Sequence, residues 1–162
     1  MICSDMQGNN DEKGYDITVI RAKIEMYCSR AEQCLSSVRR KLAEWHVPAA
    51  DAENLVAELV ADGFINERRY AEAFVHDRLK FGKCGRNKIR FELRQKQIDG
   101  KIVSEALSSI DEDEYLALLQ TVAESKKRSL KGLEPAARQR RLQSFLLSRG
   151  FEMEYIIRYN NK

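Results

Sequence analysis

Three arginines spaced four residues apart form the most prominent chemical pattern of this chain. Arg86, Arg90 and Arg94 occupy positions i, i+4 and i+8, so a helix places their guanidinium groups along one flank. Because like charges at this spacing repel one another, each pair costs the helix roughly 0.2–0.5 kcal/mol. We therefore expect an anion beside this flank.

Two sources of that anion stay open at the level of sequence. In the structural alternative, acidic side chains of neighbouring helices pair with the arginines; the candidates are Asp99, Glu105 and residues 111–114. In the functional alternative, the three arginines line a groove for an external anion, either a nucleic acid backbone or an acidic protein surface. They would then form the contact line for a partner.

Basic residues are concentrated in two stretches, although the net charge of the 162-residue chain is only +3. Residues 78–96 and residues 126–149 each contain eight basic residues and one acidic residue, so each stretch carries a net charge of +7. Such a concentration produces a local field that attracts acidic partners. The candidate partner- or DNA-binding residues are Arg78, Lys80, Lys83, Arg86, Lys88, Arg90, Arg94, Lys96, Lys126, Lys127, Arg128, Arg138, Arg141 and Arg149.

Catalytic chemistry finds no support in the chain. It contains no glycine-rich phosphate loop, no zinc-protease helix motif and no nucleophile elbow. His76 stands beside Asp77 and Arg78, and we interpret it as a solvated or ion-paired histidine rather than a general base. We therefore predict that the protein is not an enzyme.

The cysteines and the composition indicate a cytoplasmic protein without a cofactor. None of Cys3, Cys28, Cys34 and Cys84 has the paired spacing of zinc ligands, so we interpret them as free thiols in a reducing compartment. A metal site that combines three of them with His76 has no ligand-pair spacing to support it. No apolar stretch approaches the roughly 18–20 residues that cross a bilayer, and the N-terminus lacks a signal-peptide pattern. We expect no metal, no membrane contact and a monomer.

The elements that must position the basic residues form a repeat of about 51 residues. Each copy contains three apolar residues, with the second four positions after the first and the third five positions after the second. The first copy has Val38, Leu42 and Val47, the second has Ile89, Leu93 and Ile98, and the third has Leu142, Leu146 and Phe151. The spacing predicts a helix, a short break and a second helix. Because no segment alternates with a period of two, we expect no sheet. The predicted fold class is all-α, with tandem three-helix repeats in an elongated, curved array whose last repeat is truncated.

The repeat also suggests a division of the chain. Residues 1–14 are too polar to offset the entropy of ordering and are predicted to be a disordered tail. We expect an N-terminal helix plus a first three-helix repeat over 15–82, a second three-helix repeat over 83–131 and a third, incomplete one over 132–162. Within the first of these ranges, Ser29 to Glu32 has the spacing of a capping box that opens a helix.

Several motifs resemble the RecX family of bacterial recombinase regulators. The segment from Gly63 to Arg78 has the family's order of glycine, aromatic and aliphatic residues, and the stretches 85–98 and 149–151 continue it. The resemblance covers residues 30 to 159. Its core positions are Gly63, Phe64, Ile65, Tyr70, Ala71, Phe74, Ile89, Leu93, Ile98, Gly150 and Phe151. Two positions depart from the family pattern: Gln97 stands where glycine is common, and Lys83-Cys84 precede Gly85.

The resemblance implies three three-helix units in a curved molecule that binds the RecA recombinase filament. It implies that the protein mainly inhibits ATP hydrolysis, filament growth and strand exchange, in recombination, DNA repair and the SOS response. DNA binding by relatives is also implied. A rival hypothesis from the residues alone is a sequence-independent DNA-binding protein that uses the basic helix edges, with salt-sensitive affinity. Few aromatic residues, chiefly Phe81 and Phe91, lie near the first basic stretch, so base stacking is a weaker expectation.

Overall fold

The computed structural model describes residues 15–161, and within them the chain consists of helices and connecting loops with no strand. The predicted all-α class is confirmed. The predicted disordered tail, residues 1–14, lies outside the described residues. The described chain divides into two compact units, with the boundary between Ile65 and Asn66.

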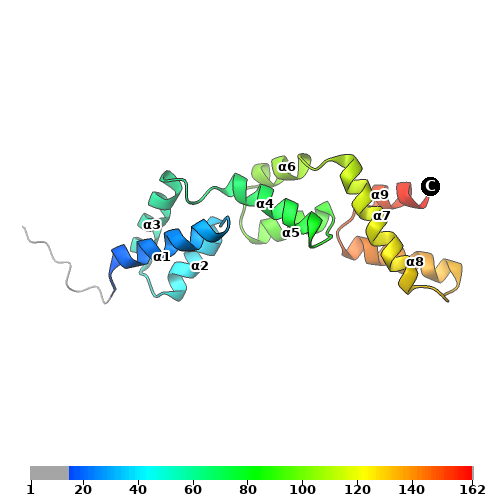
Figure 1. The fold of residues 1–162 in the computed structure, drawn as a ribbon, viewed down its shortest axis with the longest axis horizontal. Coiled ribbons are helices and arrows are strands. Elements are labelled where there is room, and N and C mark those ends of the chain that lie inside the picture. The colour runs from blue at the N-terminus through cyan, green and yellow to red at the C-terminus, as the bar shows by residue number, and fades with distance from the viewer. Residues whose placement is uncertain (1–14, 162) are drawn as a thin grey trace, which may run out of the picture. The chain divides into compact units, whose positions relative to one another are not determined.

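The first unit is built from three helices, α1 (Ile17–Arg30), α2 (Leu35–Glu44) and α3 (Ala49–Ala61) (Figure 1). Its core is apolar: Ile24, Leu42 and Leu59 are fully buried where the three helices meet. On the surface of this unit, Arg21 of α1 pairs with Glu25 on its own helix at 2.8 Å, and with Glu58 and Asp62 at the end of α3. These contacts join the first and third helices.

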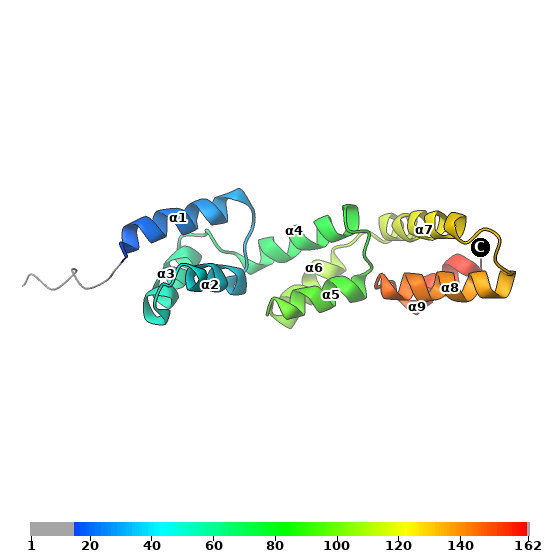
Figure 2. The ribbon, with the colours of Figure 1, turned by 90° about the horizontal axis from the view of Figure 1, so that it is seen from below.

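The second unit contains six helices in two groups (Figure 2). The first group is α4 (Glu67–Lys80), α5 (Arg86–Gln95) and α6 (Gly100–Ser108); the second is α7 (Glu112–Ser129), α8 (Pro135–Ser148) and α9 (Met153–Asn160). Helix α4 packs on α6 and α5, and α7 packs on α8 and α9.

This grouping differs from the expected boundaries at 82/83 and 131/132. Helix α4 was expected to be the third helix of the first repeat, but it packs on α6, and Arg68 of α4 pairs with Glu105 of α6. Counted from α4, the second unit holds two complete groups of three helices. The expected truncation of the last repeat is therefore corrected: the count from the sequence started one helix too late.

The repeated apolar spacing encodes one turn that occurs three times. The second residue after each first helix of the pattern adopts a positive φ: 58° at His46, 63° at Gln97 and 90° at Gly150. The following amide donates to a carbonyl five residues back: Val47 to Leu42 at 3.1 Å, Ile98 to Leu93 at 3.2 Å and Phe151 to Leu146 at 3.1 Å. This is the Schellman arrangement, which satisfies the last carbonyls of a helix. Gln97 thus takes a left-handed conformation that glycine adopts at less cost.

Helix starts follow their capping residues, with one correction. The side chain of Asn66 accepts hydrogen bonds from Arg68 N and Arg69 N at 3.0 Å, and that of Asp111 accepts one from Glu114 N at 2.9 Å. The expected capping box at Ser29 does not form, because α1 continues to Arg30 and the Ser29 hydroxyl donates to a carbonyl within that helix. Helix α2 begins after Cys34 instead.

Candidate functional site

Arg86, the first residue of the arginine ladder, is held inside the second unit. Its side chain is only 14% exposed, and its guanidinium carbon lies 4.0 Å from the centre of the Tyr115 ring and 5.3 Å from that of Tyr155. Its Nη1 is 3.6 Å from Oε1 of Glu152. Cation–π contacts and an ion pair therefore compensate its charge within the protein. The structural alternative holds for Arg86, with Glu152 as a partner that the sequence did not indicate.

The hydroxyl of Tyr115 on α7 connects the starts of α5 and α9. This hydroxyl accepts a hydrogen bond from the backbone amide of Arg86 at 3.0 Å and donates one to a carboxylate oxygen of Glu152. Burial, followed by the bond to Glu152, raises the pKa of Tyr115 far above its usual value. Burial alone lowers the pKa of Arg86, but its contacts with Tyr155 and Glu152 outweigh this, and the pKa is raised. Both groups keep their protonated forms at neutral pH.

The start of α5 also rests directly on the loop between α8 and α9. The amide of Gly85 donates to the Arg149 carbonyl at 2.8 Å, and that of Asn87 donates to the Gly150 carbonyl at 3.0 Å. A Cβ on Gly85 would lie 2.3 Å from backbone atoms of Gly150 and Phe151. We call this contact, together with Arg86, Tyr115 and Glu152, the α5 joint. It occupies the amide groups that a helix start leaves without partners.

The three ladder arginines consequently do not form one exposed line. Arg90 is half-buried and donates from Nη1 to Oδ1 of Asn87 at 2.7 Å. Arg94 is exposed. Within the ladder, Arg86 thus makes interior contacts, Arg90 makes a hydrogen bond on the surface and Arg94 is exposed to solvent.

Other candidate cations of the first basic stretch pack against neighbouring side chains. Arg78 pairs with Glu92 at 2.7 Å and lies over the Phe74 ring at 5.0 Å. Lys96 lies over the same ring at 5.9 Å. Lys88 is half-buried, and its backbone would meet a Cβ placed on Gly150. These residues hold α4, α5 and the α8–α9 loop in place.

Two candidates in the second basic stretch also make internal contacts. Arg138 donates from Nη2 to the Leu133 carbonyl at 3.1 Å, which ties α8 to the loop before it. Lys127 lies over the Tyr159 ring at 4.5 Å and pairs with Glu124 at 3.5 Å. A hydrogen bond with Tyr159 raises the pKa of Lys127. Both side chains therefore stabilise the α7–α9 group.

Six basic side chains gather around two adjoining hollows beside α7 and α8. The larger has a volume of about 560 Å³ and the smaller about 330 Å³, and they share Lys126 and Phe145. We call them together the basic groove. Its cations are Lys83, Lys126, Arg128, Arg140, Arg141 and Arg149. Residues from both +7 stretches of the sequence thus meet in one place.

The lining of the basic groove is suited to an anion. None of its lining residues is acidic, and Ser125 and Ser144 supply hydroxyl groups. Thr121 and Ser129 also line it, but their hydroxyls donate to carbonyls of α7 at 2.9 Å and 2.7 Å. The side chain of Lys126 lies 4.8 Å from the centre of the Phe145 ring, so this ring holds the cation over the groove. Clefts lined by one sign of charge concentrate the field and raise the local concentration of opposite charges.

Arg149 fixes one wall of the basic groove. Its guanidinium donates to the carbonyl of Gly82 and to that of Lys83, the latter at 3.1 Å. Lys83 has a φ of 49°, a left-handed conformation that costs a lysine free energy. The bonds from Arg149 hold the loop in that conformation, so that Lys83 lines the groove.

Five of the six groove cations were among the candidates predicted from the sequence, but the sequence did not indicate how they combine. Lys83, Lys126, Arg128, Arg141 and Arg149 were predicted candidates, whereas Arg140 was not, although it belongs to the second basic stretch. The joining of the two stretches depends on tertiary packing.

Metal sites and membrane-spanning helices are absent from the described part of the chain. Among residues 15–161 no group of three or more histidine, cysteine or acidic side chains is arranged to hold a metal ion. No helix in this range combines the length and apolarity needed to cross a membrane. The described cysteines, Cys28, Cys34 and Cys84, are buried and carry free thiols.

Comparison with known proteins matches this architecture. Family models described as the second and the third three-helix domain of RecX match residues 66–107 and 112–159, which correspond to α4–α6 and α7–α9. The regulatory protein RecX of Chlorobium phaeobacteroides is 32% identical over 151 residues, covering 93% of each chain. That of Pelodictyon phaeoclathratiforme is 33% identical over 119 residues, covering 74% of this chain and 72% of the relative.

The chain belongs to the RecX family. Two solved RecX structures also share its fold. A crystal structure of a regulatory protein RecX has a TM-score of 0.80 at 22% identity, covering 90% of this chain and 74% of that one. RecX from Lactobacillus salivarius has a TM-score of 0.76 at 22% identity, covering 86% and 91%.

The RecX motif residues occupy core and turn positions in this chain. Ile65, Ile89 and Leu93 are buried, as are Tyr70, Ala71, Ile98 and Phe151, while Phe64 and Phe74 are partly buried. Gly63 has a φ of 77° at the turn after α3, and Gly150 fits against α5. The motif therefore specifies the helix groups, whereas the basic groove lies on their surface.

Proposed function

We propose that this RecX-family protein binds the RecA recombinase filament and inhibits its ATP hydrolysis, growth and strand exchange, with the basic groove as a principal contact. The observation that supports this most directly is the groove itself, which presents six cations and no carboxylate on a member of a regulatory family. A RecA filament on DNA offers two anionic surfaces, the DNA backbone and acidic side chains of the protein. In this role the protein acts as a cytoplasmic binding protein without catalytic activity of its own.

The groove has the parts that contact with a nucleic acid backbone requires. Phosphate oxygens accept hydrogen bonds from lysine, arginine and serine side chains, and all three residue types line it. Such contacts are independent of base sequence, which suits a partner that covers DNA of any sequence. We infer that the groove meets the filament at a phosphate-rich part of its surface.

A second candidate function is direct binding to DNA without RecA. The same groove favours it, because cations that displace counterions from phosphates give affinity to any DNA. Phe145 is the aromatic residue of the groove, and Lys126 covers its ring, so stacking on bases adds little. This alternative requires strong binding to DNA alone at low salt, with a steep loss as salt rises.

The direct test is DNA-dependent ATP hydrolysis by the cognate RecA. We expect the folded protein to reduce the hydrolysis rate when it is present at fewer copies than RecA, since a bound regulator affects the neighbouring subunits of a filament. The rate is measured on single-stranded DNA that is present in excess, so that competition for DNA alone cannot lower it. Unchanged ATP hydrolysis in the presence of the folded protein would rule out the proposed function.

A further inference from the structure

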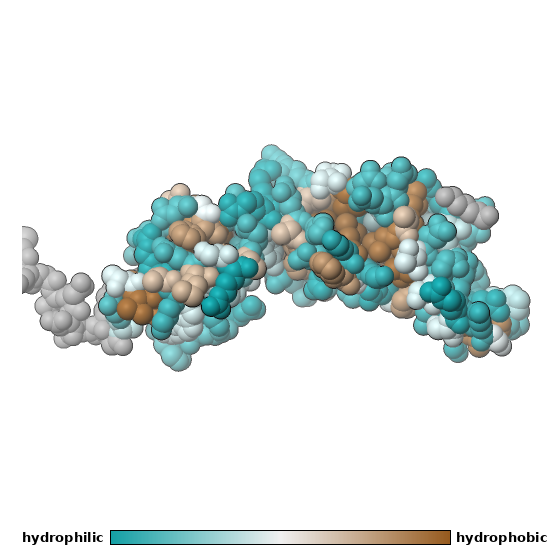
Figure 3. Space-filling view, viewed as in Figure 1, coloured by the Kyte–Doolittle hydropathy of each residue, from teal (hydrophilic) through white to brown (hydrophobic). Residues whose placement is uncertain are grey.

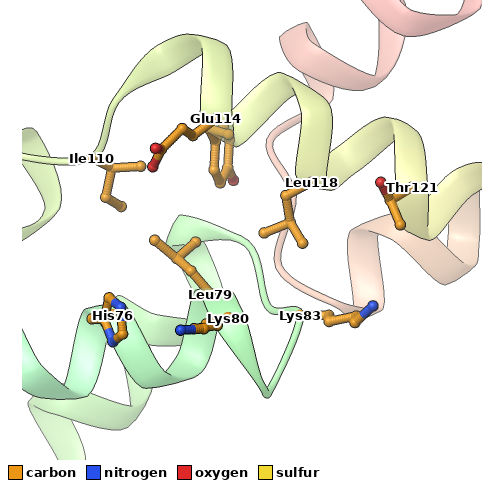
Figure 4. A pocket seen from close by; sticks show the side chains of 9 residues that line it. His76, Leu79, Lys80, Lys83, Ile110, Glu114, Leu118 and Thr121 are labelled. Carbon is orange, nitrogen blue, oxygen red and sulfur yellow. The ribbon is translucent and has the colours of Figure 1, made fainter.

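A separate pocket of about 490 Å³ adjoins the basic groove between α4 and α7. Three aliphatic side chains, Leu79, Ile110 and Leu118, point into the space between the two helices (Figure 4). All three pack against the core but are only partly buried, so part of their apolar surface faces water in the free protein. We call this space the aliphatic pocket.

The surface around the aliphatic pocket differs from that around the groove. On the face drawn in Figure 3, hydrophobic surface lies between the α4–α6 group and the start of α7, while the surface over α8 is mainly hydrophilic. Lys80 and Lys83 stand at the α4 side of the pocket, and Glu114 lies on α7 (Figure 4). Lys80 is exposed, and its ammonium lies 5.5 Å from the centre of the Phe81 ring. An apolar floor is thus bordered by two lysines on one side and by a single carboxylate, Glu114, on the other.

The chemistry of the aliphatic pocket is poorly suited to a nucleic acid base. Bases bind proteins by stacking on aromatic or guanidinium planes. The pocket has two aromatic residues, Tyr115 and His76. The Tyr115 ring is already covered, because its centroid lies 4.0 Å from the guanidinium carbon of Arg86 and 5.6 and 5.3 Å from the ring centroids of Phe151 and Tyr155. His76 lies beside Asp77, with 3.3 Å between Nδ1 and Oδ1, and this carboxylate would repel a nucleic acid backbone. An aliphatic side chain, by contrast, gains from contact with leucine and isoleucine whatever its orientation.

We propose that the aliphatic pocket binds an acidic protein segment that inserts one large aliphatic side chain. This inference rests on the proposed function, and it assigns to the pocket a protein contact that is chemically distinct from the phosphate contacts of the groove. The inserted side chain covers Leu79, Ile110 and Leu118, and acidic residues beside it pair with Lys80 and Lys83. Because Lys83 and Thr121 line both the pocket and the groove, one partner can occupy the two together.

Substitution at the pocket floor separates protein binding from DNA binding. Leu118→Ala removes aliphatic contact without changing charge, so we expect affinity for RecA filaments on single-stranded DNA to fall about tenfold, as at a binding hot spot. Affinity for the same DNA without RecA should stay within about twofold, because phosphate binding depends on charge. Both affinities are measured on immobilised single-stranded DNA, with or without a RecA filament held by a non-hydrolysable ATP analogue.

A matched control lies on the same helix. Leu116 is also partly buried and packs on the same core, but it lines a different hollow on α7. Leu116→Ala should bind filaments as the natural chain does, and thermal unfolding compares the stability of the two variants. The inference is wrong if folded Leu118→Ala binds filaments as tightly as the wild-type protein. It is also wrong if Leu116→Ala loses as much filament affinity as Leu118→Ala. An equal loss of affinity for naked DNA contradicts it too, because the pocket would then serve DNA.

A second pair of variants keeps the test independent of folding. Lys80→Glu reverses an exposed charge at the pocket rim, and Lys101→Glu makes the same change at an exposed residue of α6. We expect about fivefold weaker filament binding for Lys80→Glu than for Lys101→Glu, since like charges then face the acidic segment. Equal affinities overturn the inference. If the wild-type protein itself does not bind filaments, both the proposed function and this inference are wrong. If the wild-type protein inhibits RecA and the pocket variants bind filaments as well as it does, only the inference about the pocket is wrong.

Discussion

The Gly150→Ala variant is expected to have a free energy of unfolding lower by about 3 kcal/mol than the natural chain. Gly150 has a φ of 90°, where a side chain costs roughly 1–2 kcal/mol. A Cβ there would also lie 2.4 Å from the backbone nitrogen of Lys88, and relieving such a clash costs about 1–3 kcal/mol more. The clash pushes α5 away from the α8–α9 loop and opens the α5 joint.

Gly132→Ala is the matched control for this prediction. Gly132 has nearly the same φ, 93°, but a Cβ there meets no atom within 4 Å. It should therefore lose only the conformational part, about 1–2 kcal/mol. Chemical denaturation followed by circular dichroism gives both values. Equal losses in the two variants would mean that the close approach of Gly150 to α5 does not contribute to stability.

Reversal of three groove charges is expected to weaken DNA binding about 100-fold at low salt, with a corresponding loss of filament binding. The variant combines Arg128→Glu, Arg140→Glu and Arg141→Glu, all at exposed positions that line the basic groove. A phosphate that the variant no longer neutralises keeps its counterion, so fewer counterions are released on binding. The slope of log affinity against log salt on single-stranded DNA should therefore become shallower by about 2.

The control for this variant has the same change in net charge at other exposed positions. Lys23→Glu, Arg40→Glu and Lys101→Glu together reverse three charges that do not line the groove. Binding to labelled single-stranded DNA across a salt series compares the two triple variants. If both lose affinity equally, net charge rather than the groove governs binding.

Repeat periodicity predicted the helices and their turns well because both are local. The spacing of Leu42, Leu93 and Leu146 from the next apolar residue encodes the same left-handed turn, which His46, Gln97 and Gly150 each adopt. Where a repeat begins is not a local property. Helix α4 follows α3 in the sequence, but it packs on α6 and α5, and this packing decides its group.

The burial and contacts of Arg86, Arg90 and Arg94 could not be predicted for a related reason. A spacing of four residues places side chains on one flank of a helix but does not say what packs on that flank. Gly85 has no side chain to cap α5. The first amides of α5 instead donate to the carbonyls of Arg149 and Gly150 and to the Tyr115 hydroxyl, and these bonds bury the Arg86 side chain. The groove instead combines cations from three parts of the chain that only the tertiary structure brings together.

The measurement that tests the central claim most directly is RecA ATP hydrolysis on excess single-stranded DNA, titrated with the natural chain and with both triple charge variants. We predict that the natural chain and the control variant inhibit hydrolysis at fewer copies than RecA. The groove variant should require at least about tenfold more protein for the same inhibition, in line with the loss expected when contact charges are reversed. Inhibition by the folded groove variant at the same concentration as the natural chain would contradict the role of the basic groove.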